Sequence, residues 1–292
     1  MEQHQNRREN DSFLRCDLHT HSVFSDGTYT PGEIVAEAKR LGLIVALTDH
    51  NTAAGLPEFM AAAAELGVTA VPGVEFSTEY EGKELHLLGL FVLPEHYGAI
   101  ERMVREQHVL KEISNMELVE RLNQAGYLID YANVKRRNPN GNANRAHMAA
   151  ELMEQGYVTS VREAFDTILR DDGGFYVPPS RLQLTDVIKS LRRIGVLPVL
   201  AHPLQELTES ELRTLIPIAK EAGLLGMETM HSSYSPDTIC LAEKIASEFC
   251  LLSSGGSDFH GLVKPDISLG TGKGWLSIPE DIYLHLLAAW QS

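Results

Sequence analysis

Histidine and carboxylate side chains of the kinds that bind divalent metals gather in six short motifs along this chain. The motifs are DLHTHSVFSDG, TDHN, PGVEFS, ELHLLGL, LAHP and GSDFHG. Their candidate metal ligands are His19, His21, Asp26, His50, Glu75, His86, His202, Asp258 and His260. His19 and His21 are two residues apart, so on an extended segment both imidazoles point the same way and can bind one ion. Such a pair alone is as typical of packed or surface histidines as it is of a metal site. Five further motifs make coincidence a poor explanation.

So many ligands exceed the needs of one ion. At roughly four to six ligands per ion, some of them water, the set predicts two or three divalent metal ions that share at least one carboxylate. Imidazole mixed with carboxylate suits Mn²⁺, Fe²⁺ or Zn²⁺, and the absence of thiolates disfavours a structural zinc site. Close divalent cations generate hydroxide from bound water and stabilise the attacking and leaving oxygens at phosphorus. The motifs therefore predict a metal-dependent phosphoesterase that uses metal-bound hydroxide.

Apolar runs rich in Val, Ile or Leu precede most of the motifs, so their side chains should emerge at strand ends around one mouth. We expect a strand over 13–18, a helix from a capping box at Thr30 and Glu33 to Leu41, and a strand over 43–47. A helix over 53–66 and a strand ending near Glu75 should follow, and then a hairpin that carries His86. Further helices are expected over 185–193, 209–221, 236–248 and 279–290. This alternation favours a parallel sheet or barrel.

A mostly helical stretch interrupts the alternation from about residue 94 to residue 179. It includes a second apparent capping box at Ser160 and Glu163, and it ends in DDGGFYVPPS, a Gly- and Pro-rich hinge candidate. One barrel with one insert explains 292 residues better than two sequential domains. We expect a barrel over 13–93 and 180–292, an inserted helical subdomain over 94–179, and a flexible N-terminal tail over 1–12.

Composition indicates a soluble cytoplasmic protein. The chain is 43% hydrophobic and 22% charged, its N-terminus lacks the apolar segment of a signal peptide, and no apolar stretch is long enough to span a membrane. Its three cysteines form no paired framework, and Cys16 and Cys250 are expected to be buried thiols. A formal net charge of −15 argues against a long duplex nucleic acid as partner. A local basic cluster of Lys135, Arg136, Arg137 and Arg145 fits either a ligand site or a solvated helix face.

The motifs resemble, in order and over nearly the whole chain, those of the PHP family, named for its polymerase and histidinol phosphatase members. The resemblance is carried by His19-Thr20-His21 with Asp26, Asp49-His50, Glu75, His86, Ala201-His202-Pro203 and Ser257-Asp258-Phe259-His260. It implies a distorted (β/α)7 TIM-like barrel with three metal ions at its C-terminal mouth. One ion would be held by His19, His21, Glu75 and Asp258, a second by Glu75, His86 and His202, and a third by Asp26, His50 and His260. Asp26 stands where many relatives have histidine, so the third site is expected to be weaker or to differ in metal preference.

Within this family the chain looks like the branch of nucleoside 3′,5′-bisphosphate phosphatases and related 5′-to-3′ exoribonucleases. GVEFS, HLLGL, YVP and the segment Asn144-Arg145-Ala146-His147 in the insert carry this likeness. It implies that Arg145, His147 and Asn144 bind a substrate phosphate, although this chain lacks the Pro usually found between the Arg and the His. From the residues alone, a helix-capping role stays open. His231, at an apparent strand exit, is a substrate-side candidate or a packed polar residue; His4, His96, His108 and His285 are expected at the surface.

The leading hypothesis is hydrolysis of the 3′-phosphate of a nucleoside 3′,5′-bisphosphate. The alternatives are a 5′-to-3′ exoribonuclease acting on short 5′-phosphorylated RNA, a histidinol phosphatase, and a non-catalytic PHP module. The expected partner is accordingly a small phosphorylated nucleotide or a short RNA, with no membrane.

Overall fold

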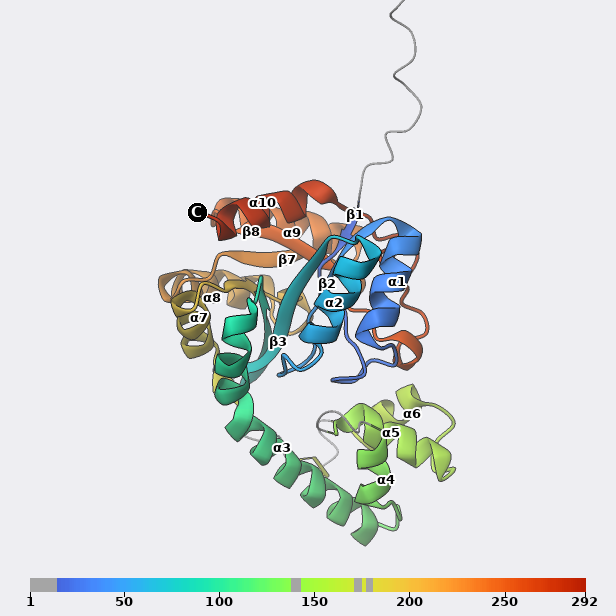
Figure 1. The fold of residues 1–292 in the computed structure, drawn as a ribbon. Coiled ribbons are helices and arrows are strands. Elements are labelled where there is room, and N and C mark those ends of the chain that lie inside the picture. Colours follow the sequence, from blue (N-terminus) through green and yellow to red (C-terminus); the bar gives the residue numbers. More distant parts are fainter. Residues whose placement is uncertain (1–14, 138–142, 171–174, 177–180) are drawn as a thin grey trace, which may run out of the picture.

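Among the described residues nine strands form one sheet, and seven of them curl into a nearly closed barrel (Figure 1). The computed structural model describes residues 15–137, 143–170, 175–176 and 181–292. In spatial order the barrel strands are β8 (Leu252–Gly256), β7 (Gly226–His231), β6 (Leu197–Leu200), β4 (Lys83–Leu90), β3 (Ala70–Tyr80), β2 (Leu43–Leu47) and β1 (Arg15–Asp17). A hydrogen bond of 3.1 Å from the Leu18 N–H to the Gly255 carbonyl brings β1 beside β8. The predicted barrel is therefore confirmed.

The hairpin of β3 and β4 distorts the barrel. It makes two antiparallel pairs, β3 with β4 and β4 with β6, in a sheet whose other barrel pairs are parallel. The short strands β5 (Leu182–Gln183) and β9 (Ile278–Pro279) pair with β3 and β1. Because the hairpin extends β3 to Tyr80, Glu75 lies in the middle of this strand, and its expected place at a strand end is wrong.

Six helices pack around the barrel (Figure 1). They are α1 (Pro31–Leu41), α2 (Leu56–Leu66), α7 (Leu184–Arg193), α8 (Glu209–Ala222), α9 (Pro236–Glu248) and α10 (Glu280–Trp290). The capping box at Thr30 and Glu33 is present as predicted. Helix α2 begins later than residue 53, because Glu101 accepts hydrogen bonds from the Ala53 N–H and the Thr52 hydroxyl and holds this segment outside the helix. Short 3-10 turns η1 (Pro94–His96), η2 (Pro203–Gln205) and η3 (Gly261–Val263) complete the barrel region.

The interrupting segment is helical, as expected. It contains α3 (Tyr97–Gln124), α4 (Tyr131–Arg136), α5 (Arg145–Glu154) and α6 (Val161–Asp166), and α3 carries the chain away from the barrel (Figure 1). Ile100 and Val104 belong to the barrel core, whereas Leu118 and Leu122 belong to a second apolar core with α4 to α6. The change of core therefore falls within α3, farther along the chain than residue 94. We propose that this second core makes the insert a separate folding unit.

The second capping box is only half formed. The Ser160 hydroxyl accepts a hydrogen bond from the Glu163 N–H at 3.0 Å, but the Glu163 carboxylate accepts from the Thr159 N–H at 2.6 Å. In a complete capping box the Glu163 carboxylate would accept from the Ser160 N–H. Here it accepts from the residue before, so Thr159 is hydrogen-bonded to the first turn of α6. The expected tail over 1–12, with His4, and most of the hinge candidate over 171–180 lie outside the described residues.

Lys135 and Arg137 of the local basic cluster form ion pairs on the insert. Lys135 Nζ lies 2.7 Å from a Glu112 carboxylate oxygen, and the Arg137 guanidinium lies 2.7 Å from Glu151. These two side chains therefore match the helix-face interpretation. Cys16 is buried as predicted, but Cys250 is exposed because the chain takes a left-handed turn there (φ 51°) between α9 and β8. Among the described residues, no helix combines the length and apolar character needed to cross a membrane.

Candidate active site

Backbone hydrogen bonds beyond the strand ends join the first and last motifs. The Asp258 N–H donates to the His19 carbonyl at 2.9 Å, and the His21 N–H donates to the Phe259 carbonyl at 2.9 Å. Gly256 lies directly against this pair of segments, since a Cβ at that position would be 2.2 Å from the His19 Cβ. The small residue before the last motif therefore allows its ligands to approach those of the first.

A second set of backbone contacts brings three more motifs to the same mouth. His50 forms an isolated parallel bridge with Glu75 on β3. The Ala201 N–H donates to the His86 carbonyl at 2.9 Å, so His202 follows β6 beside His86 on β4. His202 itself has strained backbone angles (φ 27°, ψ 47°), which are rare for a residue with a Cβ.

Glu75 is the centre of this arrangement. Five imidazole nitrogens lie within 3.2 Å of its two carboxylate oxygens: those of His19, His21, His50, His86 and His202. Burial raises the pKa of Glu75, but the histidines around it outweigh burial and hold the pKa well below its usual range. Glu75 therefore stays ionised, and its two oxygens would be available to hold divalent ions, the role that the resemblance implies.

Asp26 is the centre of a neighbouring group. Its Oδ1 lies 3.1 Å from His260 Nε2 and 3.8 Å from nitrogens of His50 and His21. Asp258 connects the two groups, because its Oδ1 is 3.3 Å from His21 Nε2 and 3.4 Å from His260 Nδ1. All nine candidate metal ligands named from the sequence thus lie around one continuous cluster.

The buried polar atoms of this cluster fit divalent metal ions. Asp26 Oδ1, His50 Nδ1, Glu75 Oε2 and His86 Nδ1 are buried and make no hydrogen bond despite their short contacts. Such atoms are costly to bury unless another partner satisfies them, and a cation among them would do so. The overlapping candidate groups are His21, Asp26, His50 and His260; His19, His21 and Glu75; His50, Glu75 and His86; and His19, His202 and Glu228.

Protons and metal ions compete for the histidines of this cluster. Burial alone would lower the pKa of His86, but the carboxylates of Glu75 and Glu84 raise it to about 10. At His50 burial dominates and lowers the pKa to about 3. Because a metal ion binds neutral imidazole, binding at His86 must displace a proton, and we expect metal affinity to fall as the pH falls.

Glu228 is a candidate functional residue that the sequence interpretation missed. It is fully buried on β7, where one carboxylate oxygen lies 3.0 Å from His19 Nδ1 and the other accepts a hydrogen bond from the His202 N–H at 2.7 Å. The first contact fixes the orientation of the His19 ring, and the second stabilises the strained backbone of His202. The available signal was an acidic residue inside the apolar run LLGMETM. Such a run predicts a buried strand, and a carboxylate in a buried strand needs a partner because unpaired carboxylates are almost never fully buried.

Replacing Glu228 by Gln should weaken metal binding. We expect Mn²⁺ affinity to fall by roughly 10- to 100-fold, since the amide keeps the shape but loses the charge that orients His19. Competition with a metallochromic dye measures this directly. Glu243→Gln, which removes the same charge from the exposed face of α9, is the matched control. Equal Mn²⁺ affinities in the two variants would contradict the orienting role.

Asp49 fixes the loop that carries Asp26. Its buried carboxylate accepts hydrogen bonds from the Ser22 N–H at 2.7 Å and from the hydroxyls of Ser22 and Ser25 at 2.6 Å each. Asp49→Ala would leave these donors without partners, at a cost on the order of 2–4 kcal/mol in the free energy of unfolding. Urea denaturation in the presence of a chelator measures this cost without any contribution from bound metal. A loss no larger than that of Glu243→Ala would contradict this role.

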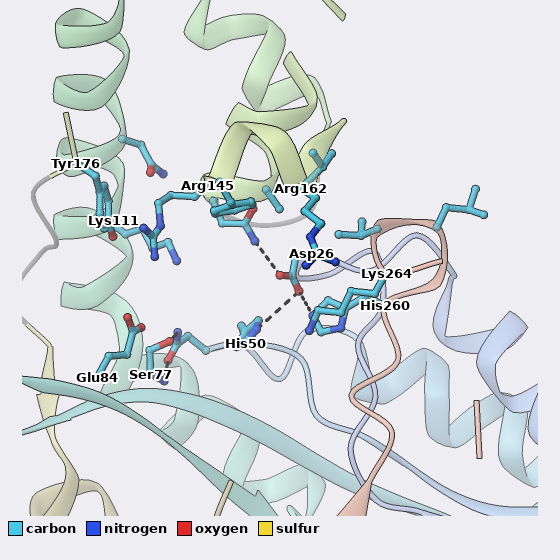
Figure 2. Close-up of a pocket in the computed structure, with 18 of the residues that line it drawn as sticks. Asp26, His50, Ser77, Glu84, Lys111, Arg145, Arg162, Tyr176, His260 and Lys264 are labelled. Atoms are coloured by element: carbon cyan, nitrogen blue, oxygen red, sulfur yellow. Dashed lines mark hydrogen bonds and ion pairs between the residues drawn. The ribbon is translucent and has the colours of Figure 1, made fainter. Parts of the chain in front are cut away.

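A cavity of about 870 Å³ opens between the barrel mouth and the insert (Figure 2). Asp26, His50 and His260 line it on the barrel side. On the opposite wall Arg145 lies beside Lys111 and Tyr176 in Figure 2, with its guanidinium 4.5 Å from the Tyr176 ring centroid. The cavity thus joins part of the candidate metal cluster to cations of the insert.

The other predicted substrate residues have structural partners. Asn144 caps α5 and donates from its side chain to Asp26 Oδ2 at 3.0 Å. His147 Nδ1 accepts the Asn144 N–H at 3.0 Å, which is the capping role that the sequence left open. His231 is only 1% exposed, and its Nδ1 lies 2.8 Å from the Ser233 hydroxyl. Contact of His147 or His231 with substrate therefore stays a prediction.

Three cations near the cluster were not predicted. Lys264 Nζ lies 2.6 Å from Asp258 Oδ2, and the Arg181 guanidinium lies 2.5 Å from Glu84. Lys111 is on α3, where burial lowers its pKa. The sequence interpretation named Arg145 as the cation for a second phosphate, and the structure adds these three to the cavity lining.

His108 differs from its prediction. It was expected at the surface, but its Nε2 lies 2.7 Å from the Asn51 carbonyl oxygen and the residue lines the cavity. The expectation is wrong because α3 forms one side of the cavity, which a helical pattern does not reveal.

The sequence and the fold are similar to those of known proteins. The PHP domain family matches residues 17–170. A 5′-3′ exoribonuclease from Haemophilus influenzae is 34% identical over 84% of this chain and 90% of its own length. A 3′,5′-nucleoside bisphosphate phosphatase from Chromobacterium violaceum is 32% identical over 84% of this chain and 86% of its own length. The solved structure of a proposed metal-dependent phosphoesterase from Bifidobacterium adolescentis has a TM-score of 0.84 and 29% identity, and the match covers 94% of this chain and 96% of that one.

Proposed function

This chain belongs to the PHP domain family, and we propose that it hydrolyses the 3′-phosphate of a small ribonucleotide that also carries a 5′-phosphate. One observation carries the proposal: a single cavity has candidate metal ligands on one side and the cations Lys111, Arg145 and Arg181 on another. A substrate with two phosphates satisfies both sets of groups, whereas a phosphomonoester with one phosphate satisfies one. The relative from C. violaceum, named for 3′,5′-nucleoside bisphosphates, supports this choice.

The protein is a hydrolase that acts on phosphoester bonds, and its own residues supply distinct parts of that reaction. Bound divalent ions would neutralise phosphate charge and acidify water at the groups centred on Glu75 and Asp26. Arg145 and Lys111 would bind the non-reacting phosphate, and the Tyr176 ring limits the positions that the Arg145 guanidinium can take. Binding energy at that phosphate orients the scissile bond, which raises the rate through positioning.

Phosphate release tests the proposal. Purified protein with Mn²⁺ should release inorganic phosphate from adenosine 3′,5′-bisphosphate at least about 100-fold more efficiently than from adenosine 3′-monophosphate, because the latter lacks the group for Arg145. Histidinol phosphate and adenosine 5′-monophosphate are the comparison substrates. Preferred hydrolysis of histidinol phosphate would overturn the proposal in favour of the other phosphatase.

A second candidate is stepwise removal of nucleotides from the 5′ end of short RNA. The exoribonuclease from H. influenzae favours it, and so does Arg162, whose side chain is 90% exposed where α6 borders the cavity and could contact a further phosphate. A 5′-phosphorylated RNA of about five nucleotides distinguishes the two activities. Mononucleotide products that appear in order from the 5′ end would establish the exonuclease, and an unchanged RNA would exclude it.

A further inference from the structure

We propose that the apolar end of the cavity is a binding slot for the nucleobase of the substrate, formed by α6 of the insert and the η3 segment of the barrel. This inference rests on the proposed function. It concerns the nucleobase, which is the part of the substrate that the phosphate-binding groups do not contact. The slot should accept more than one kind of base, since stacking on aromatic and aliphatic side chains tolerates any base. Polar side chains of the same two segments, among them Arg162 and Lys264, also line the cavity.

The insert supplies the first wall. Val161 and Phe165 are four residues apart and therefore lie on the same face of α6, and both line the cavity together with Met153 of α5. The Phe165 ring centroid is 5.8 Å from the Arg145 guanidinium. An aromatic surface thus begins beside the cation that we assign to the non-reacting phosphate, which places a base of the same nucleotide within reach of this wall.

The barrel supplies the second wall, directly after the last metal-binding motif. Leu262, Val263 and Pro265 line the same cavity. Leu262 is 77% exposed, so it contributes little to the core, and its apolar surface is available to a ligand. The segment follows His260, which is part of the Asp26 group, so this wall starts at the candidate metal cluster.

Charge and continuity argue for a nucleobase as occupant. A nucleotide that places its phosphates on the metal cluster and on Arg145 has its base left to contact other residues of the cavity, and these apolar side chains are among them. A flat ring gains contact with both walls at once, and stacking on aromatic or apolar side chains tolerates any base. A sugar bisphosphate without a base would leave both walls in contact with water.

Base-less substrates test this inference. We expect kcat/KM for the methyl riboside of ribose 3,5-bisphosphate to be roughly 10- to 100-fold below that for adenosine 3′,5′-bisphosphate. A second pair of substrates, a 5′-phosphorylated trinucleotide with and without its first base, tests whether the same slot binds the end of an RNA. The two pairs together show whether the slot serves a mononucleotide or an RNA end. Equal hydrolysis with and without the base in both pairs would overturn the slot while leaving the proposed function intact. Failure of every substrate would overturn both.

Substituting an exposed residue of the slot links the effect to this place. Leu262→Ser should lower the preference for the base-containing substrate by about 3- to 10-fold, mainly through a higher KM for that substrate. Leu128→Ser is the matched control, because Leu128 is 67% exposed on the insert and does not line the cavity. An equal preference in wild type and Leu262→Ser, with a folded variant, would place the base elsewhere.

Discussion

Replacing Glu75 by Gln is expected to lower kcat/KM by roughly three orders of magnitude or more, which corresponds to about 4 kcal/mol in the activation free energy. The reason is geometric: both carboxylate oxygens of Glu75 contact histidines from several motifs, so one change removes a carboxylate that adjacent metal ions would share. An amide offers one neutral oxygen and an N–H₂ group that repels a cation. Elemental analysis of the purified variant should show that it retains less metal than wild type.

Glu79→Gln is the matched control for this experiment. Glu79 lies on the same strand, β3, four residues farther on, and the strand register places it opposite Glu84 at the far end of the hairpin. The control should keep its metal and its activity. Circular dichroism in a chelator would show whether Glu75→Gln remains folded. A folded variant with full metal content and normal turnover would contradict the bridging role of Glu75.

The candidate metal ligands were predictable because a barrel brings its motifs together by a simple rule. Apolar runs before His19, His202 and Asp258 indicated strands, and parallel strands place their carboxyl ends at one mouth. Which atoms would meet was not predictable, since that depends on backbone bonds such as the one from Asp258 to His19. The central position of Glu75 also required the hairpin register, which no local pattern specifies.

Residues that act on the metal ligands or on the substrate from a distance were harder to find. Lys111 lies in a long helix whose charges are typical of any solvated face, and only the path of α3 brings it to the cavity. Arg181 and Lys264 fall in connecting segments without periodicity. Glu228 was overlooked because His231, three residues later, is a more conspicuous side chain. The contacts of Glu228 with His19 and with the His202 backbone become visible only when the fold is known.

Arg145→Ala is expected to separate substrate binding from chemistry. For adenosine 3′,5′-bisphosphate, kcat/KM should fall by roughly 100- to 1,000-fold, mostly through KM, because a charge-assisted contact to the non-reacting phosphate is lost. For adenosine 3′-monophosphate, which lacks that phosphate, the same change should cost less than about threefold. Comparing both substrates in both proteins therefore isolates the interaction between this side chain and the 5′-phosphate.

Two further variants determine whether the effect belongs to this guanidinium. Arg136→Ala removes the same charge from the insert at an exposed position on α4 and should leave both substrates unaffected. Arg145→Lys keeps the charge but loses the planar surface that lies over Tyr176, so it should recover only part of the affinity. An equal loss on both substrates in Arg145→Ala would show that Arg145 supports the fold or the chemistry instead. In that case Lys111 and Arg181 would be the remaining candidates for binding the second phosphate.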